Sequence, residues 1–212
     1  MTRLWLVRHG ETEWNRARRI QGATDIPLNG TGRDQARRAG ELLRRRPVDA
    51  VVASPLVRAA ETGAIVAELL GLPEPRLVPA LAERRYGVAE GLTPTEVEAR
   101  FPDGARVPGR ESRTALLDRV LPALEAIAAD HAGGSVVVAT HGAVIRTVVS
   151  AVAPDHGAAV GVPIRNGSVH SFEVGDAGLR LRRFDDPLED ESEGHRGEPL
   201  AAQNALEGAG DA

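Results

Sequence analysis

The chain has 212 residues, of which 42% are hydrophobic and 26% charged, and its formal net charge is −4 at pH 7. These values are typical of one α/β domain with its own core, and they argue against a disordered chain or a membrane-spanning protein. The sequence has no cysteine and its 26 basic residues are all arginines, which excludes disulfides, a thiol nucleophile, cysteine-bound metals, a Schiff-base lysine and a P-loop lysine.

Three short apolar runs predict buried central strands of a parallel sheet. They comprise residues 4–7, 50–53 and 136–139, and each ends in a turn that is followed by a helical pattern. The segments 168–174 and 179–184, joined by Gly-Asp-Ala-Gly, predict a β-hairpin that adds antiparallel strands at the edge.

Helical periodicity follows each central run. Asn29 is the predicted N-cap of the first long helix, Pro47 stops that helix, and Gly71 ends the second. The predicted helices comprise residues 30–46, 56–70, 112–131 and 143–152. Strands that alternate with helices predict an α/β three-layer sandwich, a mostly parallel sheet with helices on both faces and an antiparallel edge.

The charge of the sequence changes sign near residue 185. Residues 185–212 contain nine acidic side chains and one arginine, a net charge of −8, whereas residues 1–184 contain 25 arginines and 21 acidic side chains, a net charge of +4. We expect residues 1–184 to form one domain and residues 185–212 to be an acidic, flexible tail. The mildly basic domain suits a small anionic substrate, and we expect no nucleic-acid or membrane partner.

The apolar runs are too short for a secretory signal or a membrane span. The run at the N-terminus has only four residues, and the run 143–152 is interrupted by Arg146 and falls well short of the roughly 20 residues that cross a bilayer. We therefore expect a cytoplasmic protein. Its oligomeric state stays open, with a homodimer among the alternatives.

Polar side chains follow three of the predicted strands at the point where each strand ends. They are Arg8 and His9, Ser54 and Arg58, and Thr140 and His141. Ligands of open α/β sheets bind beyond the carboxyl ends of the strands. These side chains are therefore expected to converge on one site.

Five segments, in this order along the chain, resemble the histidine phosphatase superfamily in its phosphoglycerate-mutase-like branch. They are LVRHGETEWN at 6–15, QGATDIPL at 21–28, SPLVRAAET at 54–62, ERRYGVAEG at 83–91 and THG at 140–142. The resemblance extends over roughly the first 170 residues. It implies a phosphoglycerate-mutase-like fold, with residues 84–111 as a cap insertion, and hydrolysis of small phosphate monoesters through a phosphohistidine intermediate.

The residue types suit that chemistry. A neutral imidazole is a competent nucleophile near neutral pH, and His9 is the candidate. Guanidinium groups match the oxygens of a phosphoryl group, so Arg8 and Arg58 are expected to clamp it and to keep His9 neutral. Because arginines supply the positive charge, we expect no metal ion and no cofactor.

The resemblance assigns roles to further residues. His141, as a protonated ring, would donate to the phosphoryl oxygens, and Glu83 would act as the acid and base, although a glutamate among arginines is often only a surface ion pair. Asn15 could instead cap the short helix that starts at Glu13. The implied substrate-binding residues are Thr12, Asn15, Gln21, Gly22, Tyr86 and Gly142.

Two other functions stay open. The same site serves phosphoglycerate mutases, but these carry a longer, basic insertion between positions equivalent to Gly91 and Ser112 and use a lysine that this chain lacks. A catalytically silent sensor of phosphorylated ligands is the second alternative. We also hypothesise that Arg106, Arg110 and Arg113 bind a second anionic group of the substrate. The remaining histidines, at 131, 156, 170 and 195, are interpreted as structural or exposed.

Overall fold

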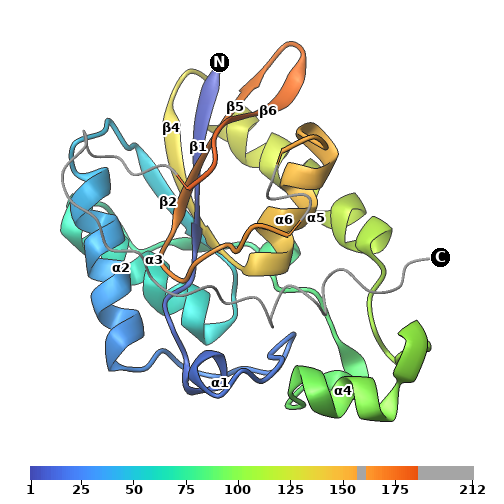
Figure 1. Ribbon diagram of the computed structural model, residues 1–212. Coiled ribbons are helices and arrows are strands. Elements are labelled where there is room, and N and C mark those ends of the chain that lie inside the picture. The colour runs from blue at the N-terminus through green and yellow to red at the C-terminus, as the bar shows by residue number, and fades with distance from the viewer. Residues whose placement is uncertain (157–160, 186–212) are drawn as a thin grey trace.

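The computed structural model of the chain describes residues 1–156 and 161–185. A six-stranded sheet runs through them in the order β3-β2-β4-β1-β5-β6 (Figure 1). The strands are β1 (Thr2–Arg8), β2 (Ala50–Ala53), β3 (Arg76–Leu77), β4 (Ser135–Thr140), β5 (Val169–Gly175) and β6 (Gly178–Arg183). The first four are mutually parallel, whereas β5 and β6 form an antiparallel edge. The predicted mostly parallel sheet with an antiparallel edge is thus confirmed.

Helices cover both faces of this sheet. Figure 1 shows α2 (Gly30–Leu43) and α3 (Val57–Leu70) on one side, and α5 (Arg113–Asp130) and α6 (Gly142–Val152) on the other. Successive side chains of a strand point to opposite faces. Trp5 and Val7 of β1 accordingly pack in one core cluster with residues of α2 and α3, whereas Leu4 and Leu6 pack in a second with α5 and α6. The three-layer sandwich is confirmed.

The helix ends follow the predicted caps. The side chain of Asn29 accepts a hydrogen bond from the amide of Gly32 at the start of α2, and Gly71, with φ of 67°, ends α3. The helix α2 ends at Leu43, earlier than predicted and several residues before Pro47. Between them the chain forms a turn, in which the amide of Arg46 donates to the carbonyl of Leu43, and Pro47 restricts only Arg46, the residue before it.

The segment of residues 84–111, called the cap from here on, has a hydrophobic cluster of its own, and its role as a cap insertion stays a prediction. It contains α4 (Pro94–Arg100) and two 3₁₀ helices, η2 (Gly87–Ala89) and η3 (Pro102–Gly104), while η1 (Pro79–Leu81) precedes it. The side chains of Tyr86, Ala89, Val97 and Val107 form a separate hydrophobic cluster. This cap lies below the sheet near α1 (Glu13–Arg16), as Figure 1 shows.

The strand register brings the ends of three parallel strands together. Arg8 at the end of β1 pairs with Thr140 at the end of β4, and Ala53 at the end of β2 pairs with Ala139. Because β5 is antiparallel to β1, its first residues lie at the same edge. The predicted convergence of the residues that follow these strands therefore has a structural basis.

In the described parts of the chain, no helix combines the length and the hydrophobicity needed to cross a bilayer. The cytoplasmic location stays a prediction. The tail predicted for residues 185–212 lies, apart from Asp185, outside the described residues, and so does His195.

Candidate active site

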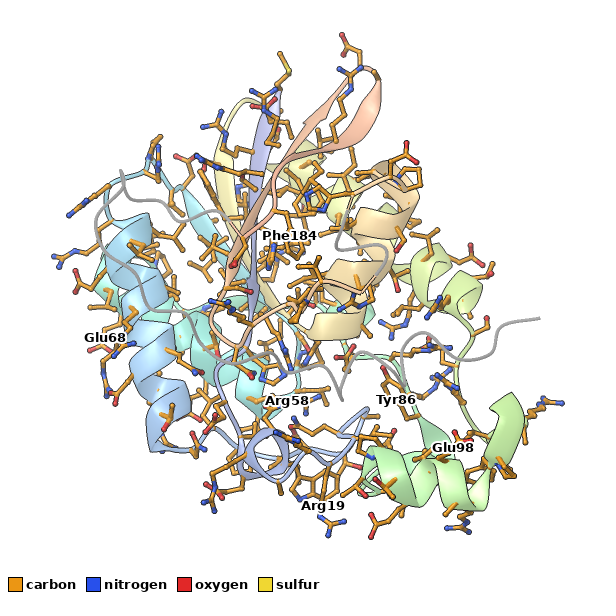
Figure 2. The ribbon with its side chains drawn as sticks, viewed as in Figure 1. Arg19, Arg58, Glu68, Tyr86, Glu98 and Phe184 are labelled. Atoms are coloured by element: carbon orange, nitrogen blue, oxygen red, sulfur yellow. The ribbon has the colours of Figure 1, made fainter. Side chains whose placement is uncertain are left out.

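A pocket opens at the carboxyl edge of the sheet between α1 and the cap. Its walls include every predicted site residue except Thr12 and His141. Residues not assigned a role from the sequence also line it, namely Arg18, Ile20 and Pro94. Figure 2 shows Arg58 below the central strands and Tyr86 beside it on the side of α4.

His9 is held as one tautomer at the base of this pocket. Its ring is 2% exposed, and Nδ1 lies 2.7 Å from the carbonyl oxygen of Gly10, which can only accept a proton. The Nε–H of Arg58 points at Nε2 of His9 at 3.3 Å. Both contacts require the proton on Nδ1, so Nε2 keeps a lone pair that faces a cation.

The glycine after His9 is required by close packing. A Cβ at Gly10 would lie 2.1 Å from the carbonyl oxygen of Gly32 in the first turn of α2. The amide of Gly10 also donates to the hydroxyl of Thr62 in α3. The loop that carries His9 is thereby pressed against two helices.

Burial keeps His9 neutral. The pKa of His9 lies well below its ordinary value, first because the ring is removed from solvent and then because Arg58 and Arg8 repel a second positive charge. The sequence predicted the effect of the two guanidiniums, but desolvation is the larger cause.

The two arginines are fixed by backbone carbonyls. Arg58 is fully buried and donates to Thr24 at 2.9 Å and to Gly22 at 2.7 Å. Burial lowers the pKa of Arg58 to about 10, while nearby carboxylates raise it in part, so the group stays charged at neutral pH. Arg8 donates to the carbonyl of Ile164. A Cβ at Gly142 would lie 3.4 Å from Nε of Arg8, so this glycine lets the guanidinium lie against the start of α6.

Asn15 both caps α1 and lines the pocket. Its Oδ1 accepts the amide hydrogen of Thr12 at 3.1 Å, which leaves the Nδ2 group on the other side. Within the described residues Nδ2 is buried and has no hydrogen-bond partner. The capping role that the sequence left as an alternative therefore coexists with a donor available to an anion.

Thr12 does not reach the pocket, contrary to the prediction of a substrate contact. It is fully buried, its hydroxyl accepts from the amide of Asn15 at 3.1 Å, and it donates to Oε1 of Gln21 at 2.9 Å. Its hydroxyl therefore caps the N-terminus of α1 and orients Gln21, which does line the pocket.

His141 lies directly behind His9. The two ring centroids are 5.2 Å apart, and Nε2 of His141 lies 2.7 Å from the hydroxyl of Ser54. Burial, followed by the charge of Arg58, lowers the pKa of His141 well below its ordinary value. These causes favour a neutral ring in the free site, and the protonated ring stays a prediction. A Ser54 hydroxyl that donates to Nε2 would place the ring proton on Nδ1, which is buried and lacks a partner among the described residues.

Glu83 extends from the segment before the cap to the start of α6. Its Oε1 accepts from the amide of Arg84 at 2.8 Å, and its Oε2 accepts from the amide of Ala143 at 3.3 Å. The carboxylate lines the same pocket as His9. Its position suits proton transfer at the pocket, which sequence alone could not establish.

A partly buried ion pair contacts the segment that carries Glu83. The guanidinium of Arg119 in α5 contacts both carboxylate oxygens of Glu111, at 2.8 and 3.0 Å. It also donates to the carbonyls of Ala80, Ala82 and Glu83. Glu111 is 5% exposed. The contacts to the three carbonyls could not be predicted from the sequence, because 36 or more residues separate Arg119 from them.

Two further polar residues were missed. Glu90 accepts from the amides of Ala23, Thr24 and Tyr86, at 2.9–3.1 Å, and so ties the loop at Gly22 to the cap. Asn166 donates to the carbonyl of His9 at 3.0 Å. The position of Asn166 could have been predicted from the hairpin. A strand antiparallel to β1 begins at the edge where β1 ends, and Asn166 precedes that strand.

The hypothesis for Arg106, Arg110 and Arg113 is not supported by their positions. None of the three lines the pocket, and Arg106 and Arg113 are exposed. Arg110 lies over the ring of Tyr86, with its central carbon 5.7 Å from the ring centroid.

The described residues contain no cluster of three or more His, Cys, Asp or Glu side chains that could hold a metal ion. Among the other histidines, His170 is fully buried in β5 and His131 is half-buried at the end of α5.

Comparison with known proteins agrees with this geometry. A sequence profile of the histidine phosphatase superfamily (branch 1) matches residues 4–187. The chain is 35% identical over 184 residues to an uncharacterized phosphatase, PhoE, of Bacillus subtilis, an alignment that covers 87% of this chain and 94% of PhoE. It is 41% identical over 161 residues to a metal-independent phosphoserine phosphatase of Arabidopsis thaliana, covering 70% of this chain and 67% of that protein.

Two more relatives are informative. A probable phosphoglycerate mutase, GpmB, of Serratia proteamaculans is 38% identical over 165 residues, which are 72% of this chain and 75% of that protein. The solved structure of YhfR from Bacillus stearothermophilus superimposes with a TM-score of 0.80 at 30% identity, over 88% of this chain and 98% of that one.

Proposed function

The chain belongs to the histidine phosphatase superfamily and is a phosphatase, and we propose that it hydrolyses small phosphate monoesters through a phosphohistidine formed on Nε2 of His9. The observation that carries this proposal is the fixed tautomer of His9, whose Nε2 lone pair faces the guanidinium of Arg58. A neutral, correctly oriented imidazole needs no separate base to become a nucleophile.

The first step transfers the phosphoryl group to the enzyme. Nε2 of His9 attacks phosphorus, the bond between phosphorus and the ester oxygen breaks, and protonated Glu83 gives its proton to the leaving alkoxide. Arg8, Arg58 and Nδ2 of Asn15 donate to the three phosphoryl oxygens. These donors are already held in place, so little reorganisation is needed as charge develops.

The second step regenerates the enzyme. The Glu83 carboxylate takes a proton from water, the water oxygen attacks phosphorus, and the bond between phosphorus and Nε2 breaks. Inorganic phosphate leaves, and Glu83 is again protonated. His141 would stabilise the intermediate through Nδ1–H, since its ring adjoins that of His9.

The mechanism can be tested with phosphate-labelled substrate and acid-labile trapping. Wild-type protein should release phosphate in the presence of a chelator and should carry an acid-labile phosphoryl group after rapid quenching. His9→Ala should lose both. Glu83→Gln should form the phosphoenzyme from p-nitrophenyl phosphate, whose leaving group needs little protonation, and should then accumulate it because water is not deprotonated. A His9→Ala protein with full turnover would overturn the mechanism, and an unlabelled, inactive wild type would favour the silent sensor.

The mutase alternative is favoured by the mutase-like segment Arg84-Arg85-Tyr86 and by the names of relatives such as GpmB. A mutase must return the phosphoryl group to a second hydroxyl before water reacts. Release of inorganic phosphate from 3-phosphoglycerate at a rate above any interconversion with 2-phosphoglycerate would support the phosphatase. Interconversion without net phosphate release would support the mutase.

A further inference from the structure

Arg18 is a cation of the pocket that the proposed reaction does not use. It is exposed and lines the pocket near Ile20 and Pro94. Arg8 and Arg58, in contrast, are buried and donate to backbone carbonyls. Within residues 1–156 and 161–185, no hydrogen bond or ion pair engages the side chain of Arg18. Its guanidinium is therefore available to a ligand.

The backbone of Arg18 occupies a position that usually belongs to glycine. Its φ is 54°, and the only other described non-glycine residue with positive φ is Asp185. The amide of Arg18 donates to the carbonyl of Asn15, and that of Arg19 donates to Trp14, the pattern that closes a helix with a left-handed residue. A bulky side chain in this region costs stability, and such residues cluster at functional sites.

The rim that carries Arg18 is joined to the cap. The amide of Gly91 donates to the carbonyl of Ile20 at 2.8 Å, and the amide of Ile20 donates to Leu92 at 2.9 Å. These two bonds hold the segment 18–20 against the segment that leads into α4. Arg18 is thus positioned by a fixed frame, with Ile20, Tyr86 and Pro94 as carbon-rich neighbours along the pocket wall.

Asn15 and Arg18 lie at different depths of the pocket. Asn15, within α1, is 8% exposed and presents its unpartnered amide group, whereas Arg18, two residues after α1 ends, is exposed at the mouth. A phosphoryl group at His9 would occupy the deep end, which leaves the carbon skeleton of a small substrate to extend toward Arg18.

The charges of the pocket point to the same conclusion. The lining residues include three guanidiniums, of Arg8, Arg18 and Arg58, and one carboxyl, of Glu83. A phosphate dianion at His9 balances the two buried guanidiniums, of Arg8 and Arg58, whereas Arg18 is exposed at the mouth. One positive charge then remains at the rim.

We propose that Arg18 binds a carboxylate of the substrate, so that the pocket selects small phosphate monoesters with a carboxylate at the end remote from the ester. The planar guanidinium can donate two parallel hydrogen bonds to a carboxylate, and a single cation matches a monoanion better than a second phosphate dianion. This inference rests on the proposed phosphatase function and specifies its substrate class.

The test compares two competing ligands that differ only in a carboxylate, phosphoserine and phosphoethanolamine. Each is measured as an inhibitor of p-nitrophenyl phosphate hydrolysis. Wild-type protein should bind phosphoserine about tenfold more tightly, as expected for one charge-assisted contact at a solvent-accessible rim. Arg18→Gln should reduce this ratio to about one. Arg16→Gln, which removes an exposed arginine of α1 that does not line the pocket, should keep the ratio.

Three outcomes would overturn the proposal: a wild type that binds both ligands equally, an Arg18→Gln variant that keeps the preference, or an Arg110→Gln variant that alone removes it. Arg18→Gly serves as a folding control. It should lose the preference while the melting temperature rises, because glycine adopts positive φ without strain. A wild type that hydrolyses no monoester at all, p-nitrophenyl phosphate included, would instead be a failure of the phosphatase function itself.

Discussion

The side-chain amide of Asn166 donates a hydrogen bond of 3.0 Å to the carbonyl oxygen of His9, across 157 residues of sequence. The same amide group lies 3.3 Å from Oδ1 of Asn15. Asn166 thus joins the start of the antiparallel edge to the loop that carries His9 and to Asn15, which lines the pocket. Both contacts orient groups of the site without touching the reacting atoms.

Replacement of Asn166 by alanine should slow phosphoryl transfer. The carbonyl of His9 would lose its donor, and the amide of Asn15 would lose one of the contacts that fix its orientation. We expect kcat to fall about tenfold, which corresponds to the loss of one partly buried hydrogen bond of about 1.4 kcal/mol. Steady-state kinetics on p-nitrophenyl phosphate would measure it. As a control, Arg165→Ala, at the neighbouring exposed residue, should behave as wild type. An unchanged kcat in Asn166→Ala would show that the hydrogen bond from Asn166 to the carbonyl of His9 is dispensable.

Two glycines offer a matched pair for the packing argument. A Cβ at Gly10 would lie 2.1 Å from a backbone oxygen of α2, whereas a Cβ at Gly30 would meet nothing within 4 Å. We expect Gly10→Ala to lower the free energy of unfolding by at least about 2 kcal/mol and to abolish activity, since the loop of His9 must shift. Gly30→Ala should raise stability by about 0.5–1 kcal/mol. Urea titration would measure both, and equal stabilities would contradict the close-packing account.

The architecture and the position of His9 could be predicted because their signals are local. Apolar runs, caps such as Asn29 and the order of strands and helices are written within short segments, and the polar residues after each strand must meet wherever parallel strands share an edge. The placement of His9, Arg8 and Arg58 in one pocket follows from these signals.

The features that escaped prediction depend on distant partners. The hydroxyl of Thr12 donates to Gln21 and does not reach the pocket, and burial is the largest cause of the lowered pKa of His141. Arg119 and Glu90 act through carbonyls and amides far along the chain. The positive φ of Arg18 has no signature in a sequence where glycine would be the expected residue.

The ion pair of Arg119 and Glu111 should affect catalysis through Glu83. Arg119→Lys would keep a charge but lose most of the contacts to the carbonyls of Ala80, Ala82 and Glu83. We expect kcat to fall about tenfold or more on an alkyl phosphate, which needs a proton on its leaving group, and less on p-nitrophenyl phosphate. An equal loss on both substrates would indicate a structural role alone. Arg76→Lys, at an exposed ion pair with Asp130, is the control that should leave both rates unchanged.

The pH dependence of stability should report on His170, a buried histidine that does not line the pocket. His170 is fully buried, its Nε2 lies 2.8 Å from the hydroxyl of Ser168, and its Nδ1 accepts from the amide of Asp185 at 3.0 Å. Burial, followed by the charges of Arg8 and His156, lowers the pKa of His170 to about 3.

Because the unfolded chain binds a proton near pH 6.5 that the native ring does not, the stability that neutral His170 contributes is complete above that pH and is lost as the pH falls toward the folded pKa. The loss attributable to this ring between pH 6.5 and 5 should be about 2 kcal/mol. The free energy of unfolding of His170→Leu should therefore fall less steeply with acidification than that of the wild type. The difference in slope should correspond to about one proton taken up on unfolding, whatever the stability of the variant at pH 7. The half-buried His131→Gln is the control, and a slope in His170→Leu equal to that of the wild type would mean that the ring of His170 is protonated in the native protein.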